Sequence, residues 1–216
     1  MQRIDLAVLA DELAAARPRL EDGEQRLALT MYRLLAEGRP VTPASLADAA
    51  GEGGIRGLLE PRFGAELDPD GSVVAFWGLS LSQTRHRLDI GGRRLYAWCA
   101  WDALFLPALV NETLAVESAC PTTGDRITLT VAPDGVRRVQ PAAAVLSMRQ
   151  PDAGFSADTR ASFCRHVHFF ASEDAFVQWP GREDATFAVT IDDGFDVASR
   201  VNRASYPSAL RDGVPS

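Results

Sequence analysis

The first 50 residues carry apolar side chains at the spacing of amphipathic helices. The spacing predicts helices over residues 4–15 and 27–35, and a glycine and a proline soon after residue 35 stop the second. Thr42 is suited to cap a third helix over residues 43–50, because its hydroxyl accepts a hydrogen bond from a free backbone N–H. A short fourth helix is predicted over residues 54–59.

A hairpin follows these helices, with two strands around a Pro-Asp-Gly turn within residues 67–77. Helices followed by a hairpin indicate a winged-helix-like module, which we place over residues 1–80. Its charge argues against DNA binding, because it holds 8 arginines against 13 acidic residues, a net charge of −5, and cationic side chains dominate DNA affinity. The helix over residues 43–50, in the recognition position, has no arginine. We therefore expect a scaffold module and no nucleic-acid partner.

The rest of the chain is richer in strands, because apolar and polar residues alternate over several of its segments. We also expect two helices in it, over residues 97–109 and 192–205. Strands are predicted over residues 85–90, 94–98, 113–119, 126–131, 136–139, 145–148 and 163–171. The fold class is α+β, in which the helical module packs on a second domain. That domain, over residues 81–216, is a mixed or antiparallel sheet with flanking helices and carries the candidate chemistry.

Composition narrows the class of protein. The chain has 216 residues, a net charge of −7 and 46% hydrophobic residues, which excludes a disordered or collagen-like chain. All its cations are arginine, and we attach no mechanism to the missing lysines. Three cysteines cannot form a fully paired disulfide framework. No signal peptide or membrane span is visible, so we expect a cytoplasmic protein with no membrane partner.

Cys99 and Asp102 are three residues apart. If residues 98–109 are helical, both side chains lie on one face, about 5–6 Å apart. A carboxylate alone raises the pKa of a neighbouring thiol, because two anions repel. The pair therefore suits a site where a bound cation deprotonates the thiol. The alternative is a buried core thiol beside a carboxylate on the helix surface.

Cys164 begins the pattern Cys-x-His-x-His. On a strand, period two places Cys164, His166 and His168 on one face, where cysteine and histidine are common zinc ligands. The spacing is not that of a structural zinc motif, so hydrogen-bonded core histidines are the favoured interpretation. Cys120, at a strand end before Pro121, is predicted to be a small buried hydrophobic residue.

Two thiols and one carboxylate brought together suit a soft, thiophilic metal, of which mercury is the extreme. The segment Tyr96–Leu109, YAWCAWDALFLPAL, resembles the first active-site segment of the bacterial organomercurial (alkylmercury) lyases. The segment Ser162–Ser172, SFCRHVHFFAS, resembles the second. Some members have a second cysteine where this chain has Arg165. The similarity is strongest over residues 90–172.

This resemblance implies a function and a role for each residue. Cys99 and Cys164 would hold the mercury, Asp102 would transfer the proton, and Cys120 would be structural. The reaction would be protonolysis of a carbon–mercury bond to a hydrocarbon and Hg(II). It implies no organic cofactor, a small organomercurial substrate, and cellular thiols or a mercuric reductase as the Hg(II) acceptor. We expect a monomer or a homodimer.

Two other functions stay open on the sequence. One is a metal-responsive winged-helix protein whose cysteines bind a thiophilic ion. The other is a relative of the lyases that acts on a different organometal, such as an organotin.

Overall fold

The computed structural model describes residues 4–50, 64–152, 154–155 and 158–211. The chain begins with three helices, which are α1 (Leu6–Ala15), α2 (Asp22–Leu35) and α3 (Pro43–Ala50). Asp5 caps α1 through its carboxylate, and a capping box between Glu21 and Glu24 starts α2. The three predicted helices are confirmed, and the fourth, over residues 54–59, lies outside the described residues.

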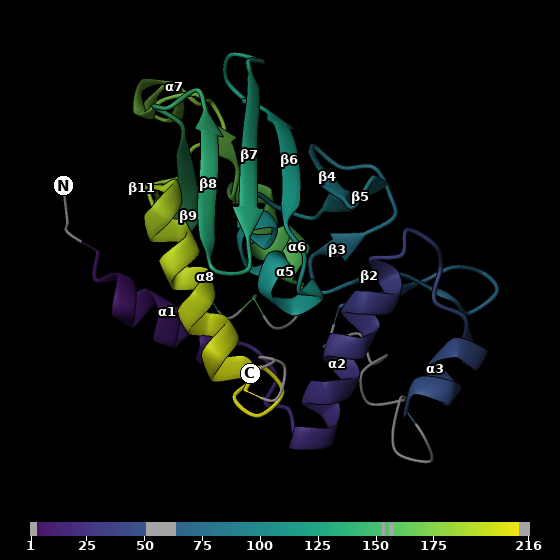
Figure 1. Cartoon of the computed structure of the whole chain (residues 1–216). Coiled ribbons are helices and arrows are strands. Elements are labelled where there is room, and N and C mark those ends of the chain that lie inside the picture. The colour runs from purple at the N-terminus through teal and green to yellow at the C-terminus, as the bar shows by residue number, and fades with distance from the viewer. Residues whose placement is uncertain (1–3, 51–63, 153, 156–157, 212–216) are drawn as a thin grey trace.

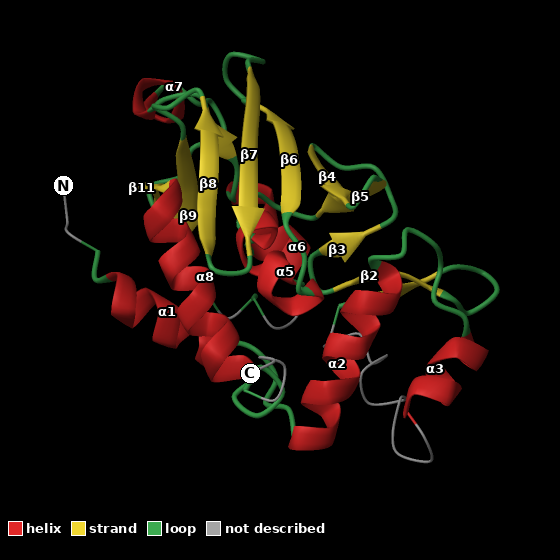
Figure 2. Cartoon of the chain, in the orientation of Figure 1, coloured by secondary structure: helices red, strands yellow, loops and turns green. Residues whose placement is uncertain are grey.

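Most of the strands form one antiparallel sheet, in the order β1-β2-β3-β5-β4-β6-β7-β8 (Figure 2). The strands are β1 (Ala65–Leu67), β2 (Val73–Phe76), β3 (Leu79–Ser80), β4 (His86–Ile90), β5 (Arg93–Ala97), β6 (Leu114–Ala119), β7 (Arg126–Ala132) and β8 (Gly135–Gln140). The short strand β3 pairs with β2 on one side and with β5 on the other. The sheet therefore runs without a break across residue 80, where the sequence placed a domain boundary.

A smaller antiparallel sheet has the order β10-β9-β11. Its strands are β9 (Val145–Arg149), β10 (Phe169–Phe170) and β11 (Thr186–Thr190). The helices of this half are α5 (Asp102–Val110), α6 (Thr159–Ser162), α7 (Glu173–Val177) and α8 (Ile191–Ser205). The α+β fold class is confirmed.

Helix α5 lies at the centre of the core, and all but one of its nine residues are buried. Such a helix is hydrophobic all round, because it is covered on every side. Helix α8 packs on α1, α5 and the β8 and β9 strands, and α2 packs on α5 and β2 (Figure 1). The Asn202 amide donates to the Phe105 carbonyl at 2.9 Å and ties α8 to α5.

Of the strand predicted over residues 163–171, Phe169–Phe170 forms a strand and the residues before it do not. The chain forms α6, then a 3₁₀ turn (η2, Cys164–His166), and only then the two-residue strand β10. Phe163, Val167 and Phe169 are all buried. A short apolar run that is buried on every side does not distinguish a strand from a compact turn. In the part of the chain that the structure describes, no helix is long and apolar enough to cross a membrane.

Candidate active site

Cys99 lies in the turn between β5 and α5. The backbone on either side of it is fixed by two long-range hydrogen bonds. Trp98 N–H donates to the Gly78 carbonyl at 2.9 Å, and Ala100 N–H donates to the Val167 carbonyl at 3.2 Å. The first bond ties the turn to the β2–β3 segment, and the second ties it to the segment that carries Cys164.

Cys164 begins the 3₁₀ turn, and β9 holds that turn in place. Ser147, in the middle of β9, donates its hydroxyl to the His166 carbonyl at 2.7 Å. His168 N–H donates back to the Ser147 Oγ at 2.9 Å. One buried serine therefore satisfies the backbone on both sides of Val167, which in turn accepts from Ala100.

These two segments bring Cys99, Asp102 and Cys164 together, although Cys164 is far from the other two in sequence. Two sulfurs and a carboxylate oxygen all lie within 4.8 Å of one another. The side chains are closed off from solvent, with exposed fractions of 0% for Cys99 and 5% for both Asp102 and Cys164. Atoms at this separation can coordinate one metal ion.

The contact between Cys99 and Asp102 is not the one that the sequence predicted. Helix α5 begins at Asp102, so Cys99 precedes the helix and the two do not share a helix face. Instead, Cys99 N–H donates to the Asp102 Oδ2 at 2.7 Å. The carboxylate accepts a backbone N–H just before the helix, and this bond fixes its position beside the thiol.

Gly78 supports the other side of the Asp102 carboxyl group. A Cβ at Gly78 would lie 2.8 Å from the Asp102 Cγ and 2.9 Å from its Oδ1, too close for any side chain. The backbone there has φ +97°, a region that favours glycine. The sequence reasoning missed Gly78, because nothing local in Phe76–Ser80 relates it to a residue that lies 24 positions further on.

Burial sets the protonation of the site. It raises the pKa of Asp102 to about 6, while hydrogen bonds from Cys99 and the charges of Arg17 and Arg160 oppose the rise. Burial also raises the pKa of Cys99 well above its usual value, helped by a hydrogen bond to Cys164. A hydrogen bond from Cys99 lowers the pKa of Cys164, but burial and the Asp102 charge outweigh it, so this pKa is also raised.

Aromatic residues flank the three groups in the sequence and pack on one another. The Trp101 ring packs edge-on against Phe105 at 5.4 Å and against Phe163 at 6.0 Å between centroids. Its indole N–H donates to the Gly194 carbonyl at 3.1 Å. The Arg160 guanidinium carbon lies 5.2 Å from the centre of the Trp98 ring. This apolar setting explains why burial is the largest cause of the raised pKa of Asp102.

A zinc site at Cys164, His166 and His168 does not form among the described residues. Because Cys164 and His166 belong to a 3₁₀ turn, period two does not apply to them. His166 Nε2 lies 3.7 Å from Glu183, and the His168 ring is stacked on His86 at 6.0 Å. His166 is buried, and His168 is half-buried with its Nε2 2.9 Å from the Arg165 carbonyl oxygen.

Cys120 is also apart from the three-residue group. It follows β6 and is buried, with its N–H donating to the Asp125 carbonyl at 2.8 Å. Within the described ranges, the group of potential metal ligands contains Cys99, Asp102 and Cys164 but not this third thiol.

Two buried thiols beside a buried carboxylate suit a class of protein that binds a soft metal through sulfur and has an acid–base group at hand. The family model MerB, alkylmercury lyase, matches residues 79–202. The alkylmercury lyase of Pseudomonas putida is 44% identical over 171 residues, which cover 78% of this chain and 79% of that protein. That of Staphylococcus epidermidis is 38% identical over 185 residues, which cover 85% and 84%. The chain belongs to the alkylmercury lyase family, so the resemblance seen in the sequence is confirmed.

A solved structure is similar in fold. The crystal structure of the mercury-bound form of MerB2 superposes with a TM-score of 0.72 and covers 94% of this chain and 99% of its own. Its sequence is 23% identical, so this likeness concerns the fold.

Proposed function

We propose that this protein is an organomercurial lyase, which cleaves the carbon–mercury bond of organomercurials by protonolysis in mercury detoxification. Cys99 and Cys164 hold the mercury, and Asp102 transfers the proton. The observation that carries the proposal is the convergence of two sulfurs and a carboxylate oxygen within 4.8 Å in a closed apolar site. Membership of the alkylmercury lyase family supports it.

The raised pKa values determine which groups are protonated before the substrate binds. Near neutral pH both thiols are protonated, because burial raises the pKa of Cys99 and of Cys164. Asp102, with a pKa of about 6, is mainly a carboxylate that can accept a proton. The site therefore contains one base and two proton sources before the substrate binds.

The reaction then follows from these positions. The Cys164 sulfur displaces the ligand X from R–Hg–X, and its proton leaves with X⁻ as HX. Cys99, whose sulfur lies within 4.8 Å of an Asp102 carboxylate oxygen, gives its proton to the carboxylate as its sulfur joins the mercury. Asp102 passes this proton to carbon, and the electron pair of the carbon–mercury bond becomes the carbon–hydrogen bond. The products are R–H, HX and Hg(II) held by two thiolates.

The thiolates and Asp102 each make a contribution that is missing from the uncatalysed cleavage in water. Two thiolates push electron density onto mercury and weaken its bond to carbon. Asp102 delivers a proton to a poor leaving group as the bond breaks, which is general acid catalysis. Mercury is in the same oxidation state before and after, so the reaction needs neither a redox cofactor nor an external electron. Cellular thiols or a mercuric reductase would then remove the bound Hg(II).

The test is hydrocarbon release. The purified protein is incubated with phenylmercury and excess free thiol, and benzene is measured by gas chromatography. We expect catalytic benzene release, and loss of at least about a hundredfold in Cys99→Ser, Cys164→Ser and Asp102→Ala. The matched control is Cys120→Ser, which changes the third cysteine without touching the group. A folded protein that releases no benzene would refute the function.

Two further points belong to this proposal. The site thiols must stay reduced to bind mercury, so we expect the protein to act in the reducing cytoplasm. Because the group of Cys99, Asp102 and Cys164 lies within one chain, a monomer would be active. Light scattering combined with activity at decreasing protein concentration tests whether a dimer is required.

A further inference from the structure

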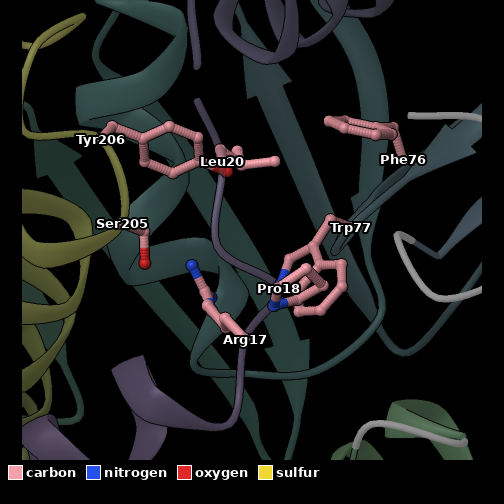
Figure 3. A pocket seen from close by; sticks show the side chains of 7 residues that line it. All are labelled: Arg17, Pro18, Leu20, Phe76, Trp77, Ser205 and Tyr206. Carbon is pink, nitrogen blue, oxygen red and sulfur yellow. The ribbon is translucent and has the colours of Figure 1, made fainter. Parts of the chain in front are cut away.

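Arg17, in the loop after α1, reaches into the aromatic wall of the site. Its exposed fraction is 7%. The guanidinium carbon lies 4.8 Å from the centre of the Phe105 ring and 5.5 Å from the rings of both Trp77 and Trp101. A small cavity of about 20 Å³ beside Arg17 is also lined by Trp77, Ser205 and Tyr206 (Figure 3). An N-terminal residue thus lies inside the core of the other half of the chain.

Two of these rings belong to residues next to the Asp102 carboxyl group or to the glycine that packs against it. Trp101 directly precedes Asp102, and Trp77 directly precedes Gly78, which packs against the Asp102 carboxyl group. Trp77 has φ +32°, rare for a non-glycine residue, and the Tyr32 hydroxyl donates to its carbonyl at 3.0 Å. Arg17 therefore packs against both of the segments that determine where the carboxylate lies.

Among the described residues, no carboxylate forms an ion pair with Arg17. Its Nε and Nη1 are buried, and neither has a hydrogen-bond acceptor in that part of the chain. A buried cation without a counter-charge is costly. The charge of Arg17 opposes the rise in the pKa of Asp102, Cys164, Tyr32 and Tyr206. Of these four groups, Asp102 is the one that is mainly ionised near neutral pH.

We propose that Arg17 is a positioning residue of the lyase site, which holds the Trp77–Gly78 and Trp101–Asp102 segments together and balances the negative charge of the mercury-bound site. Mercury held by two thiolates beside a carboxylate gives the closed site a net negative charge, and a guanidinium is always protonated. The N-terminal segment thereby takes part in catalysis. This inference rests on the proposed function for the identity of the reaction.

The test separates charge from packing. Arg17→Met removes the charge but keeps an unbranched apolar side chain that packs well against aromatic rings. Arg17→Lys keeps the charge and loses the planar group. The matched control is Ser205→Ala, which removes a neighbouring uncharged hydroxyl, buried and without a hydrogen-bond partner among the described residues. kcat and KM for phenylmercury are measured well below each variant's melting temperature.

We expect Arg17→Met to lower kcat by about 10-fold to 100-fold, as for other groups that orient a metal-binding site, with a smaller change in KM. Arg17→Lys should recover part of the loss, and Ser205→Ala should match the wild type. If Arg17→Met keeps the wild-type kcat, or if Lys is no better than Met, the proposal is wrong. Arg17→Gln carries the same test should the Met variant not fold.

A second measurement does not depend on turnover. Hg(II) is titrated onto each variant in competition with a dithiol chelator. Arg17→Met should weaken Hg(II) binding by about tenfold in the wild-type background and by clearly less when Asp102 is already replaced by Asn. An equal loss in both backgrounds would refute action through Asp102. If the wild type releases no hydrocarbon, the lyase function fails, whereas the charge effect on Hg(II) binding is still measured.

Discussion

Gly78→Ala tests whether the position of the Asp102 carboxylate controls turnover. The new Cβ would lie 2.8 Å from the Asp102 Cγ and 2.9 Å from its Oδ1. Carbon atoms in contact are normally about 3.5 Å apart or more, so the carboxyl group must move by roughly 0.7 Å. That movement strains the 2.7 Å hydrogen bond from Cys99 N–H that now holds the carboxylate.

The expected magnitudes follow from this geometry. A misplacement of about 1 Å in a catalytic group costs about a hundredfold in rate, and we expect kcat to fall by that order. Alanine at φ +97° adds backbone strain of about 1–3 kcal/mol. In a chain of this size each kcal/mol lowers the melting temperature by about 2–4 °C.

The assay is benzene release from phenylmercury, with the melting temperature from circular dichroism. Gly71→Ala is the matched control, because Gly71 has φ +79° but a Cβ there would meet no described atom within 4 Å. It imposes comparable backbone strain without touching the site. Wild-type kcat in Gly78→Ala, or an equal loss of kcat in Gly71→Ala, would refute the reasoning.

Three other substitutions are predicted from the structure. Asp102→Asn should abolish turnover yet stabilise the fold near neutral pH, because it removes a buried charge. The gain is up to about 3 kcal/mol, which corresponds to a pKa raised from 3.8 to about 6, and it is measured by urea unfolding. Cys120→Ser should lower the melting temperature by several degrees and keep kcat, because it places a hydroxyl in a buried position. Gly194→Ala should cost about 1–3 kcal/mol, since its Cβ would lie 2.5 Å from Leu146 Cδ2, measured by urea unfolding.

The stability difference between the wild type and Asp102→Asn should depend on pH. Because the folded pKa of Asp102 is raised, this group binds more protons in the folded protein than in the unfolded chain between about pH 4 and pH 6. Relative to Asp102→Asn, the wild type therefore loses stability as the pH rises through this window, whereas the buried histidines contribute equally to both proteins. Identical stability profiles for the two proteins would contradict this. If Cys120→Ser lost kcat without losing stability, the structural role of Cys120 would be wrong. If Gly194→Ala had an unchanged unfolding midpoint, the close packing at Gly194 would not matter for stability.

The sequence predicted the helices and strands that have one buried and one exposed face, because such elements show a regular pattern of apolar and polar residues. Strands β6 and β7 alternate cleanly, and α8 has a strong helical period, so all three were predicted within a few residues. Strand β11 was missed because its burial does not alternate. Strand β3 has only two residues, and its place depends on pairing with β2 and β5, which no local pattern shows.

The residues of the site were identified from the sequence, but their geometry was not. Cys99, Asp102 and Cys164 were identified by resemblance, and their convergence is observed. The sequence placed Cys99 on a helix and Cys164 on a strand, whereas each lies in a turn held by distant backbone. Gly78 and Arg17 were missed, because their relation to Asp102 exists only after the sheet and the N-terminal loop have folded together.

The unbroken sheet has a consequence for how the gene can be divided. A truncated chain that starts at residue 81 loses β3 and leaves β5 with an open backbone edge, a template for aggregation. It also loses Gly78 and Arg17, although the candidate ligands Cys99, Asp102 and Cys164 remain. Expressed alone, the segment that contains every reactive group would be an incomplete catalyst.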